Sequence, residues 1–422
     1  MKILITNVRV FDGTGSAPFL GAVAIEGNRI SAVAPANAAA DLPVNAKVMD
    51  GAGAMLMPGL IEAHAHLTWP SSIERIVPDM VLPPEELALT AARNARILLD
   101  HGYTSVYSGG ALSRQLEIFL KAQMDCGGLP GPRLIPSSIE RGPPSDGGLI
   151  AQSGTASEAR GPQAVREFVR ECAAMGAKSV KFLISGESAL KPGASQEVLY
   201  TQEELQAAGE QARESNVWLT GHAHAAEAVK LGLRSGFRVL YHCTYADEEA
   251  IDLLCQRKSE VFVAPTIGIV QATLDADPPA HFDMTHMKAD AAAVLERQKS
   301  LVPQLKRLGI RVLPGGDYGF PFNPHGRNAR DLELFVEHFA YTPSEVLVAA
   351  TRLGGELMGM GDELGLIREG YLADLLLVKG DPTEDVRILQ DPNNLLAVMK
   401  DGRFHKEPVL NHGSALTARA VS

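Results

Sequence analysis

Residues 58–70, "PGLIEAHAHLTWP", decide how the rest of the chain is interpreted. A short apolar run leads into two histidines, His64 and His66, which a single alanine separates. In a β-strand, side chains two positions apart point to the same side. Both imidazoles can therefore bind one metal ion from the end of a strand. The pattern is common by chance, so its weight depends on what the rest of the chain provides.

The composition is that of a globular protein, because 45% of the 422 residues are hydrophobic and 21% are charged. This length suits a large α/β barrel with an appended domain. A formal net charge of −11 argues against a nucleic acid or an anionic membrane as the partner.

The cysteines and the N-terminus bear on the compartment. Cys126, Cys172, Cys243 and Cys255 form no Cys-x-x-Cys pair, which excludes a thiolate zinc site and fits a reducing compartment. The start "MKILITNVRV" alternates like a strand and lacks the features of a signal peptide. No run of about 18 apolar residues suggests a membrane span. We therefore expect a cytoplasmic protein without a membrane partner.

Both ends of the chain alternate apolar and polar residues as β-strands do. Residues 2–12 and 21–35 show this pattern near the start, and "DLLLVKGD" and "LLAVMKDGRF" show it near the end. We predict one small β-sandwich domain built from residues 1–57 and 363–405. The remaining tail, 406–422, is predicted to be disordered.

The middle of the chain, residues 58–362, alternates short apolar strands with helical patterns. Such alternation predicts a parallel (β/α)8 TIM barrel. The segment 270–310 is long for one crossover, so we expect a lid or an extra helix there. Residues 139–162, rich in Gly, Pro and Ser, are predicted to form a loop over the barrel mouth. The candidate strands are 59–64, 104–108, 133–138, 179–185, 217–222, 238–243, 261–266 and 311–317.

Polar residues gather where these strands end, and barrel enzymes build their active sites at those ends. The residues are His64, His66, Lys181, His222, His224, His242 and Asp317. Each has an ordinary explanation when taken alone, such as a hydrogen-bonded core histidine or a turn aspartate. Chance would scatter them over loops and helix faces. Their shared position at strand ends favours one site.

Lys181 lies inside the apolar strand "SVKFLIS". Burial of an unpaired ammonium is costly and lowers its pKa. The neutral amine can react with carbon dioxide to give a carbamate, whose two oxygens can bridge two divalent metals. The lysine therefore predicts a two-metal site.

With these residues identified, the chain resembles the amidohydrolase superfamily over nearly its full length. The segments that carry the resemblance are "MPGLIEAHAH", "VKFLISG", "TGHAHAAEAV", "YHCT", "LPGGDYG" and the closing "LGLIREGYLADLLLVKGDP". Within the superfamily the order of motifs is similar to the binuclear, carboxylated-lysine branch. More narrowly, it resembles prolidase-like dipeptidases and carboxypeptidases, a group that includes ochratoxinase-type amidases.

The resemblance implies two divalent metal ions, with zinc as the first choice. His64, His66 and Asp317 would bind the more buried metal. Lys181, as N6-carboxylysine, would bridge both metals. The resemblance also implies a homo-oligomer.

For the second metal, the resemblance implies His222 and His242 as ligands. The family ligand ends the fifth strand, and His222 directly follows "WLTG". His224 would then fall at the start of the next helix, where it could contact the substrate and stabilise an oxyanion.

The implied enzyme hydrolyses an amide bond adjacent to a C-terminal carboxylate. Its substrate would be a small molecule such as a dipeptide, an N-acyl amino acid or an ochratoxin-like N-acyl phenylalanine. A hydroxide shared by the metals would attack, with Asp317 as general base and then acid. The candidates for binding the substrate are Arg141, Tyr318, His325 and Arg327.

Two other functions stay open. A cyclic-amide hydrolase or deaminase of the imidazolonepropionase type would use one metal and would not need Lys181. A non-catalytic scaffold would have lost ligands, whereas every ligand position is filled here. The chain also departs from its relatives at Glu62, where the family pattern has aspartate, and in "SSIERGPPSDGG", which lacks an expected histidine.

Overall fold

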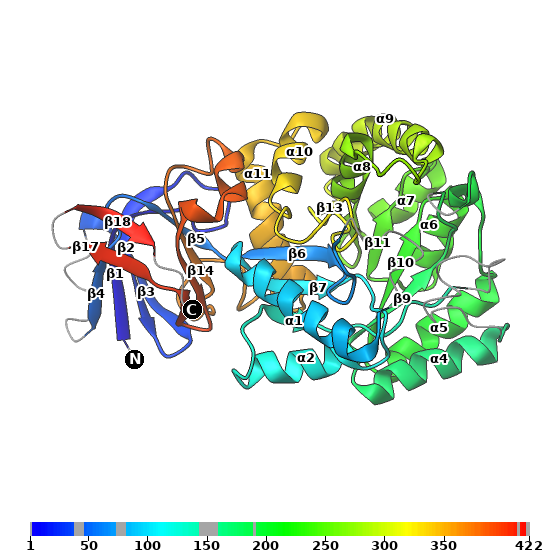
Figure 1. Ribbon diagram of the computed structural model, residues 1–422, viewed down its shortest axis with the longest axis horizontal. Helices are drawn as coiled ribbons and strands as arrows, with labels where there is room; N and C mark the ends of the chain where they lie inside the picture. Colours follow the sequence, from blue (N-terminus) through cyan, green and yellow to red (C-terminus); the bar gives the residue numbers. More distant parts are fainter. Residues whose placement is uncertain are drawn as a thin grey trace.

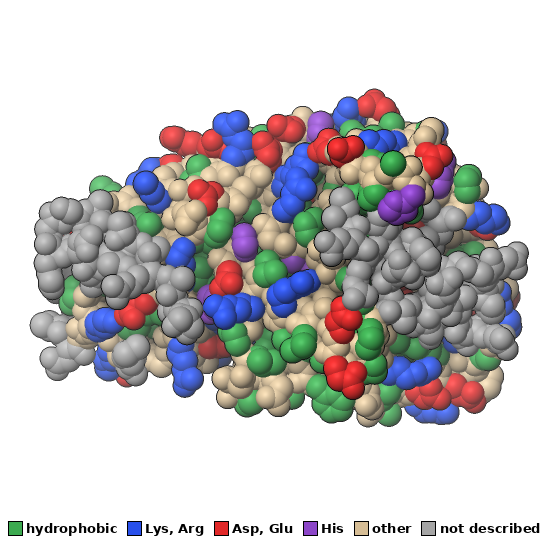
Figure 2. All heavy atoms as spheres, viewed as in Figure 1, with side chains coloured by type: hydrophobic (Ala, Val, Ile, Leu, Met, Phe, Trp, Pro, Cys, Tyr) green, Lys and Arg blue, Asp and Glu red, His purple; other side chains and the backbone are tan. Residues whose placement is uncertain are grey.

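The computed structural model describes residues 2–37, 46–72, 82–142, 159–188, 191–411 and 414–418. The chain has an α/β fold, with a mixed β-sheet at one end and a larger body of parallel strands and helices at the other (Figure 1). On the face drawn in Figure 2, acidic and basic side chains are interspersed. None of the described helices combines the length and the apolar character that a membrane crossing requires.

The mixed sheet joins the two ends of the chain. Its order is β16-β15-β14-β5-β1-β2-β3, and β4 also pairs with β1. The antiparallel pairing of β5 with β14 brings Pro58 opposite Leu375, which fastens the two parts together at the start of the parallel strands. The strands are β1 (Lys2–Val10), β2 (Phe19–Glu26), β3 (Arg29–Pro35), β4 (Lys47–Asp50), β5 (Met55–Pro58), β14 (Leu375–Val378), β15 (Leu395–Lys400) and β16 (Arg403–Lys406).

The middle of the chain forms two parallel sheets, which together hold the eight strands that the sequence predicts. Isolated parallel bridges, Arg141 to Phe182 and Ala65 to Tyr318, connect the edges of the two sheets. One sheet contains β6 (Leu60–Ala65), β7 (Tyr103–Ser108) and β8 (Arg133–Ile135). The other contains β9 (Ser179–Leu183), β10 (Trp218–Ala223), β11 (Val239–His242), β12 (Phe262–Ala264) and β13 (Arg311–Val312).

Helices follow most of the parallel strands and bury their apolar faces against them. They are α1 (Pro84–Asp100), α2 (Leu116–Asp125), α4 (Pro162–Met175), α5 (Gln202–Glu214), α6 (Ala226–Arg234), α7 (Glu248–Gln256), α8 (Ile267–Asp275), α9 (Thr285–Arg307), α10 (Arg330–Phe339), α11 (Pro343–Val348) and α12 (Gly354–Leu357). The extra helix expected in 270–310 is present, because both α8 and α9 lie between β12 and β13.

Two predicted features concern segments near or beyond the described residues. Of the expected mouth loop, residues 143–158 lie outside them. In the tail, the backbone of β17 (Pro408–Asn411) pairs antiparallel with β18 (Ser414–Ala418), and the predicted disorder of 406–422 stays a prediction.

Candidate metal centre

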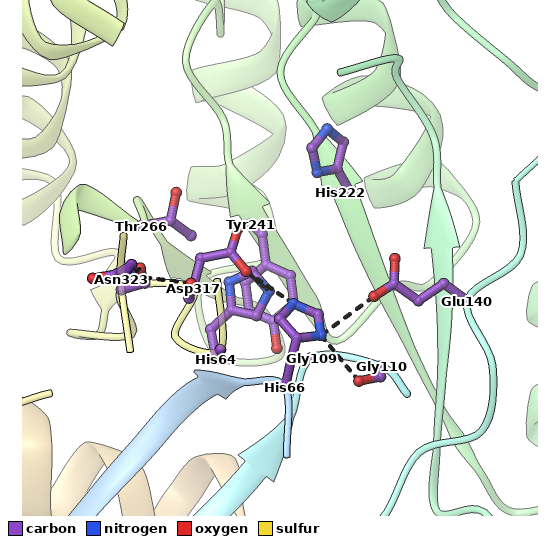
Figure 3. Close-up of polar contacts among 12 residues, drawn as sticks. His64, His66, Gly109, Gly110, Glu140, His222, Tyr241, Thr266, Asp317 and Asn323 are labelled. Carbon is purple, nitrogen blue, oxygen red and sulfur yellow. Dashed lines mark hydrogen bonds and ion pairs between the residues drawn. The ribbon is translucent and has the colours of Figure 1, made fainter. Parts of the chain in front are cut away.

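Two groups of ligand-type side chains lie at the C-terminal ends of the parallel strands. The first group is His64, His66 and Asp317, whose candidate ligand atoms all lie within 4.8 Å of one another. Asp317 Oδ1 is 2.8 Å from His66 Nε2 and 3.3 Å from His64 Nε2. Figure 3 shows the three side chains converging, His64 and His66 from the end of β6 and Asp317 from the segment that follows β13. Three buried ligands facing one point suit a divalent cation.

The second group is His222, His224 and His242, which also meet within 4.8 Å. The rings of His224 and His242 stack with their centroids 4.1 Å apart, and the His222 ring lies 4.4 Å from that of His242. All three are buried. Like-charged imidazolium groups would repel at these distances, so the arrangement favours neutral rings.

The side chain of Lys181 adjoins the first group. Its Nζ donates to the carbonyl of Gly109 at 2.8 Å and is 3.4 Å from His64 Nε2. It also lies 4.5 Å from the centre of the Tyr241 ring. Burial lowers the pKa of Lys181, although the carboxylates of Glu140 and Asp317 oppose that shift. The lowered pKa favours the neutral amine from which a carbamate can form.

Burial also sets the protonation of the histidines. It lowers the pKa of His242 and His222 well below the ordinary value, helped by neighbouring imidazoles and Lys181, and it lowers the pKa of His224 to about 4. His66 differs, because the hydrogen bond to Asp317 and the charges of Asp317 and Glu140 outweigh burial and raise its pKa. Neutral imidazole is the form that binds a metal.

Hydrogen bonds decide which ring nitrogen of each histidine is free. The Thr266 hydroxyl donates to the carbonyl of Pro265 at 2.7 Å and so accepts from His242 Nδ1 at 2.6 Å. His242 Nε2 is then buried with no hydrogen-bond partner among the described residues. In the first group, His66 Nδ1 donates to the carbonyl of Gly110 at 3.0 Å, which leaves Nε2 toward Asp317. The unpartnered Nε2 of His242 and the oriented Nε2 of His66 both fit metal ligands.

A cavity of about 310 Å³ opens above both groups. One side carries the histidines of the second group together with His66, Lys181 and Asp317. Another wall comes from α8, α9 and the segment between them, and it is mostly apolar. That wall is formed by Ile269, Val270, Thr273, Phe282, Asp283, His286, Met287, Asp290, Ala291 and Val294. Trp69 and Phe320, whose rings lie 4.4 Å apart, also line the cavity.

The four residues predicted to bind substrate do not line this cavity in the described part of the chain. Arg141 is buried, where its guanidinium donates to the carbonyl of Ala159 at 2.8 Å and stacks on Phe168. Arg327 is exposed. Tyr318 and His325 point into the protein interior, the first toward Asp331 and the second toward the carbonyl of His66. Residue type suggested these candidates, but packing directs them elsewhere.

His224 lies two residues beyond His222, after β10 ends at Ala223 and before α6 begins at Ala226. It was expected at the helix start, in contact with substrate. The structure instead brings it into the same group as His222 and His242, and it also lines the cavity. Proximity alone therefore does not separate the two candidates for the strand-five ligand.

Several polar residues of the site were not anticipated from the sequence. Glu140 Oε1 lies 3.3 Å from His66 Nδ1, and Glu187 Oε2 lies 3.6 Å from His222 Nε2. Thr244 Oγ1 contacts His224 Nδ1 at 2.9 Å. Thr244 lies in "YHCT", beside the candidate ligand His242, but Glu140 and Glu187 lie in segments that contain no candidate ligand. The position of Glu140 just beyond β8 is the signal that could have identified it, because strand ends form the site.

The family model described as "Amidohydrolase family" matches residues 55–404. The chain belongs to the amidohydrolase family. It is therefore a hydrolytic enzyme, and its two groups of histidine and aspartate side chains could hold the metal that this family generally binds. The superfamily resemblance seen in the sequence is confirmed.

Individual relatives point to the same group of amidohydrolases. Ochratoxinase from Aspergillus niger is 26% identical over 381 residues, which cover 84% of this chain and 76% of that protein. A solved structure of a Xaa-Pro dipeptidase with bound methionine in the active site is 26% identical, with a TM-score of 0.82, and the match covers 96% of this chain and 99% of that one. The crystal structure of A. niger ochratoxinase superposes with a TM-score of 0.81 at 22% identity, over 97% of this chain and 96% of that one, which supports the fold.

Proposed function

We propose that this amidohydrolase cleaves an amide bond adjacent to a C-terminal carboxylate, as in a dipeptide, an N-acyl amino acid or an ochratoxin-like N-acyl phenylalanine. The observation that carries the proposal is the pair of ligand groups with buried Lys181 beside them at the strand ends. Metal-dependent amide hydrolysis requires ligands that hold metal ions beside the substrate, and these strand ends provide them.

The architecture proposed for this site is a closed (β/α)8 barrel. The eight parallel strands and the bridges between the two sheets support closure. We further propose that residues 58–362 form this barrel and that residues 1–57 and 363–405 form the small β domain. A cytoplasmic location and a homo-oligomeric state belong to the same proposal, and gel filtration with light scattering tests the second.

The residues fit two divalent cations, with zinc as the first choice. His64, His66 and Asp317 would hold one, His222 and His242 the other, and carboxylated Lys181 would contact both. When bound, such cations supply an acidic water and polarise a carbonyl group. The orphaned Nε2 of His242 and the lowered pKa of Lys181 are the observations that support this fit.

Asp317 is the residue of this chain that can move the proton. Its carboxylate lines the cavity and is nearly buried, with 8% exposure. As a general base it would accept a proton from the attacking water and pass it to the leaving amine. His224, also in the cavity wall, is placed to donate toward the oxyanion that develops on the substrate.

The apolar wall of α8 and α9 supports a substrate with a large apolar group. Along α9 the apolar lining residues Met287, Ala291 and Val294 recur at the spacing of one helical face. Two relatives support the proposal that the substrate carries a C-terminal carboxylate. One is a dipeptidase that holds methionine, an amino acid, in its active site, and another is ochratoxinase.

The test is a screen of zinc-loaded protein on dipeptides and N-acyl amino acids, read as released amino acid. N-acyl phenylalanine should be cleaved, whereas the matching N-acyl phenylalaninamide should react about 10–100-fold more slowly, since a charged hydrogen bond contributes about 1.5–3 kcal/mol. Failure on every carboxylate-bearing amide, with turnover of a cyclic amide, would favour the imidazolonepropionase-type alternative.

A further inference from the structure

A buried carboxylate, Glu62, lies directly beneath the first ligand group. Its side chain is 2% exposed. Oε1 accepts the backbone N–H of His64 at 2.9 Å, and Oε2 accepts from Asn328 Nδ2 at 2.7 Å. Asn328 is itself 1% exposed and stands just before α10. Glu62 thus connects β6, which carries the two histidines, to the segment that follows Asp317.

A second buried carboxylate, Asp331, holds the chain on both sides of Asp317. It lies in the first turn of α10 and is 1% exposed. Oδ2 accepts the backbone N–H of Gly315 at 3.0 Å, and Oδ1 accepts the hydroxyl of Tyr318 at 2.8 Å. A Cβ on Gly316 would come within 2.4 Å of Asp331 Oδ1. Only glycine, which has no side chain, leaves room for the Asp331 carboxylate at this position.

The backbone of Asp317 needs such support. Its φ is +61°, in the left-handed region that residues other than glycine rarely adopt. Strained conformations of this kind persist only where the surroundings hold them in place. The strand before it cannot do so alone, because β13 has only two residues, Arg311 and Val312. Asn323 adds to the support by donating to the carbonyls of Gly316 and Asp317 at 2.7 and 3.1 Å.

Neither Glu62 nor Asp331 forms an ion pair with a lysine or arginine in the residues described. Neither lines the cavity, so neither can touch a substrate there. Burying a carboxylate without a cation beside it is unfavourable for folding. A purely stabilising role would be served as well by apolar residues of the same volume. The hydrogen bonds to both ligand segments indicate another role.

We propose that Glu62, Asn328 and Asp331 are positioning residues that fix Asp317 relative to His64 and His66. This positioning frame, as we call the three residues, acts through the segments 62–64 and 315–318. The inference rests on the proposed function only in naming Asp317 as the proton carrier. The frame also accounts for Glu62, the position where the chain has glutamate in place of the family's aspartate, because its oxygens span His64 and Asn328.

The test compares Asp331→Asn with a matched control, Asp374→Asn. Asp374 is also buried, at 3% exposure, and accepts hydrogen bonds from Arg133 and the backbone N–H of Asp401, away from the cavity. Asp331→Asn should lower kcat about 10–100-fold, the usual effect of removing a partner of a ligand, while KM stays within about twofold. The cobalt-substituted variant should also show an altered visible absorption spectrum. Asp374→Asn should lower Tm and leave kcat, KM and the cobalt spectrum unchanged.

Two further variants keep the inference testable if Asp331→Asn does not fold. Tyr318→Phe removes one of the two hydrogen bonds to Asp331 and should change the spectrum in the same direction but less. Asn328→Ala removes the hydrogen bond to Glu62 and should also change the spectrum. Unchanged kcat and an unchanged cobalt spectrum in folded frame variants would overturn the proposal, even with a reduced Tm. The spectrum needs no substrate, so a wild-type protein that cleaves no amide would refute the proposed function and leave this test intact.

Discussion

The two ligand groups contain similar donors in different surroundings. In the first group, His66 is backed by a backbone carbonyl and by Glu140, and the positioning frame lies beneath. In the second group, His224 and His242 are backed by the neutral hydroxyls of Thr244 and Thr266. The cavity opens over all three histidines of the second group. The comparison teaches that two carboxylates lie close to His66, at 2.8 and 3.3 Å, whereas in the second group the carboxylate of Glu187 lies farther off, 3.6 Å from His222, and neutral hydroxyls contact the other two rings.

This difference appears in the protonation of the rings. The pKa of His66 is raised by Asp317 and Glu140 in spite of burial, whereas burial lowers the pKa of His64 in the same group and of all three histidines in the second. In the absence of a cation, a protonated ring is therefore favoured only at His66 among these histidines, and neutral rings are favoured in the second group. We infer that both groups are arranged for binding, and that the close contact of Asp317 with His66 in the first group also suits the movement of a proton.

The largest effect is expected from Lys181→Met, which removes the side chain proposed to contact both metals. Metal content should fall from near two per chain to one or fewer, measured by elemental analysis. Turnover should fall by roughly a thousandfold, because a lost cation removes several kcal/mol of transition-state stabilisation. A wild-type content of one metal, unchanged in the variant, would contradict the two-metal proposal and favour the cyclic-amide alternative.

The next effect tests the proton-moving role assigned to the first group. Asp317→Asn keeps the shape of the side chain but removes its basicity, so kcat should fall about 10²–10³-fold, within the usual range for loss of a general base. Metal content should stay largely intact. Glu187→Gln offers a comparison at the second group, where loss of a carboxylate 3.6 Å from His222 should cost far less turnover. Near-normal turnover by Asp317→Asn would show that another group carries the proton.

The sequence located candidate ligands where a side chain's position follows from local pattern. His64, His66, Lys181, His242 and Asp317 each stand in or beside an apolar strand, and the parallel strands bring such ends together. That argument needs only the order of strands, which periodicity reveals.

The remainder of the site depends on distances that no spacing encodes. Glu140 contacts His66 although the two residues are 74 positions apart in the sequence. Asp331, in α10, accepts a hydrogen bond from the backbone N–H of Gly315. The direction of Arg141 depends on packing in the same way, since its guanidinium lies over the ring of Phe168 and does not line the cavity. Side-chain direction beyond a strand end is set by packing of the loops, and the local sequence does not state it.

The second group can be divided further by comparing His222→Asn with His224→Asn. His222 lies within β10, where it pairs in register with Tyr241 of β11 and Leu183 of β9, which fixes its direction. We expect His222→Asn to lose about one metal per chain. His224→Asn should keep both metals and lose about 10–100-fold in kcat, through a weaker oxyanion contact. If His224→Asn loses the metal instead, the two roles are exchanged.

The smallest effect is expected from the hydroxyls behind the second group. Thr266→Val keeps the branched shape but removes the acceptor that holds His242 Nδ1 at 2.6 Å, so the ring loses its fixed orientation. Metal affinity should fall about tenfold, at the low end for an outer partner of a ligand. Thr244→Val removes the matching contact to His224, 2.9 Å long, and should leave metal affinity unchanged while lowering kcat slightly. Metal titration with a chelator measures both. Equal losses of affinity in the two variants would mean that His224 and His242 bind the metal alike, and the threonines would then serve one common purpose.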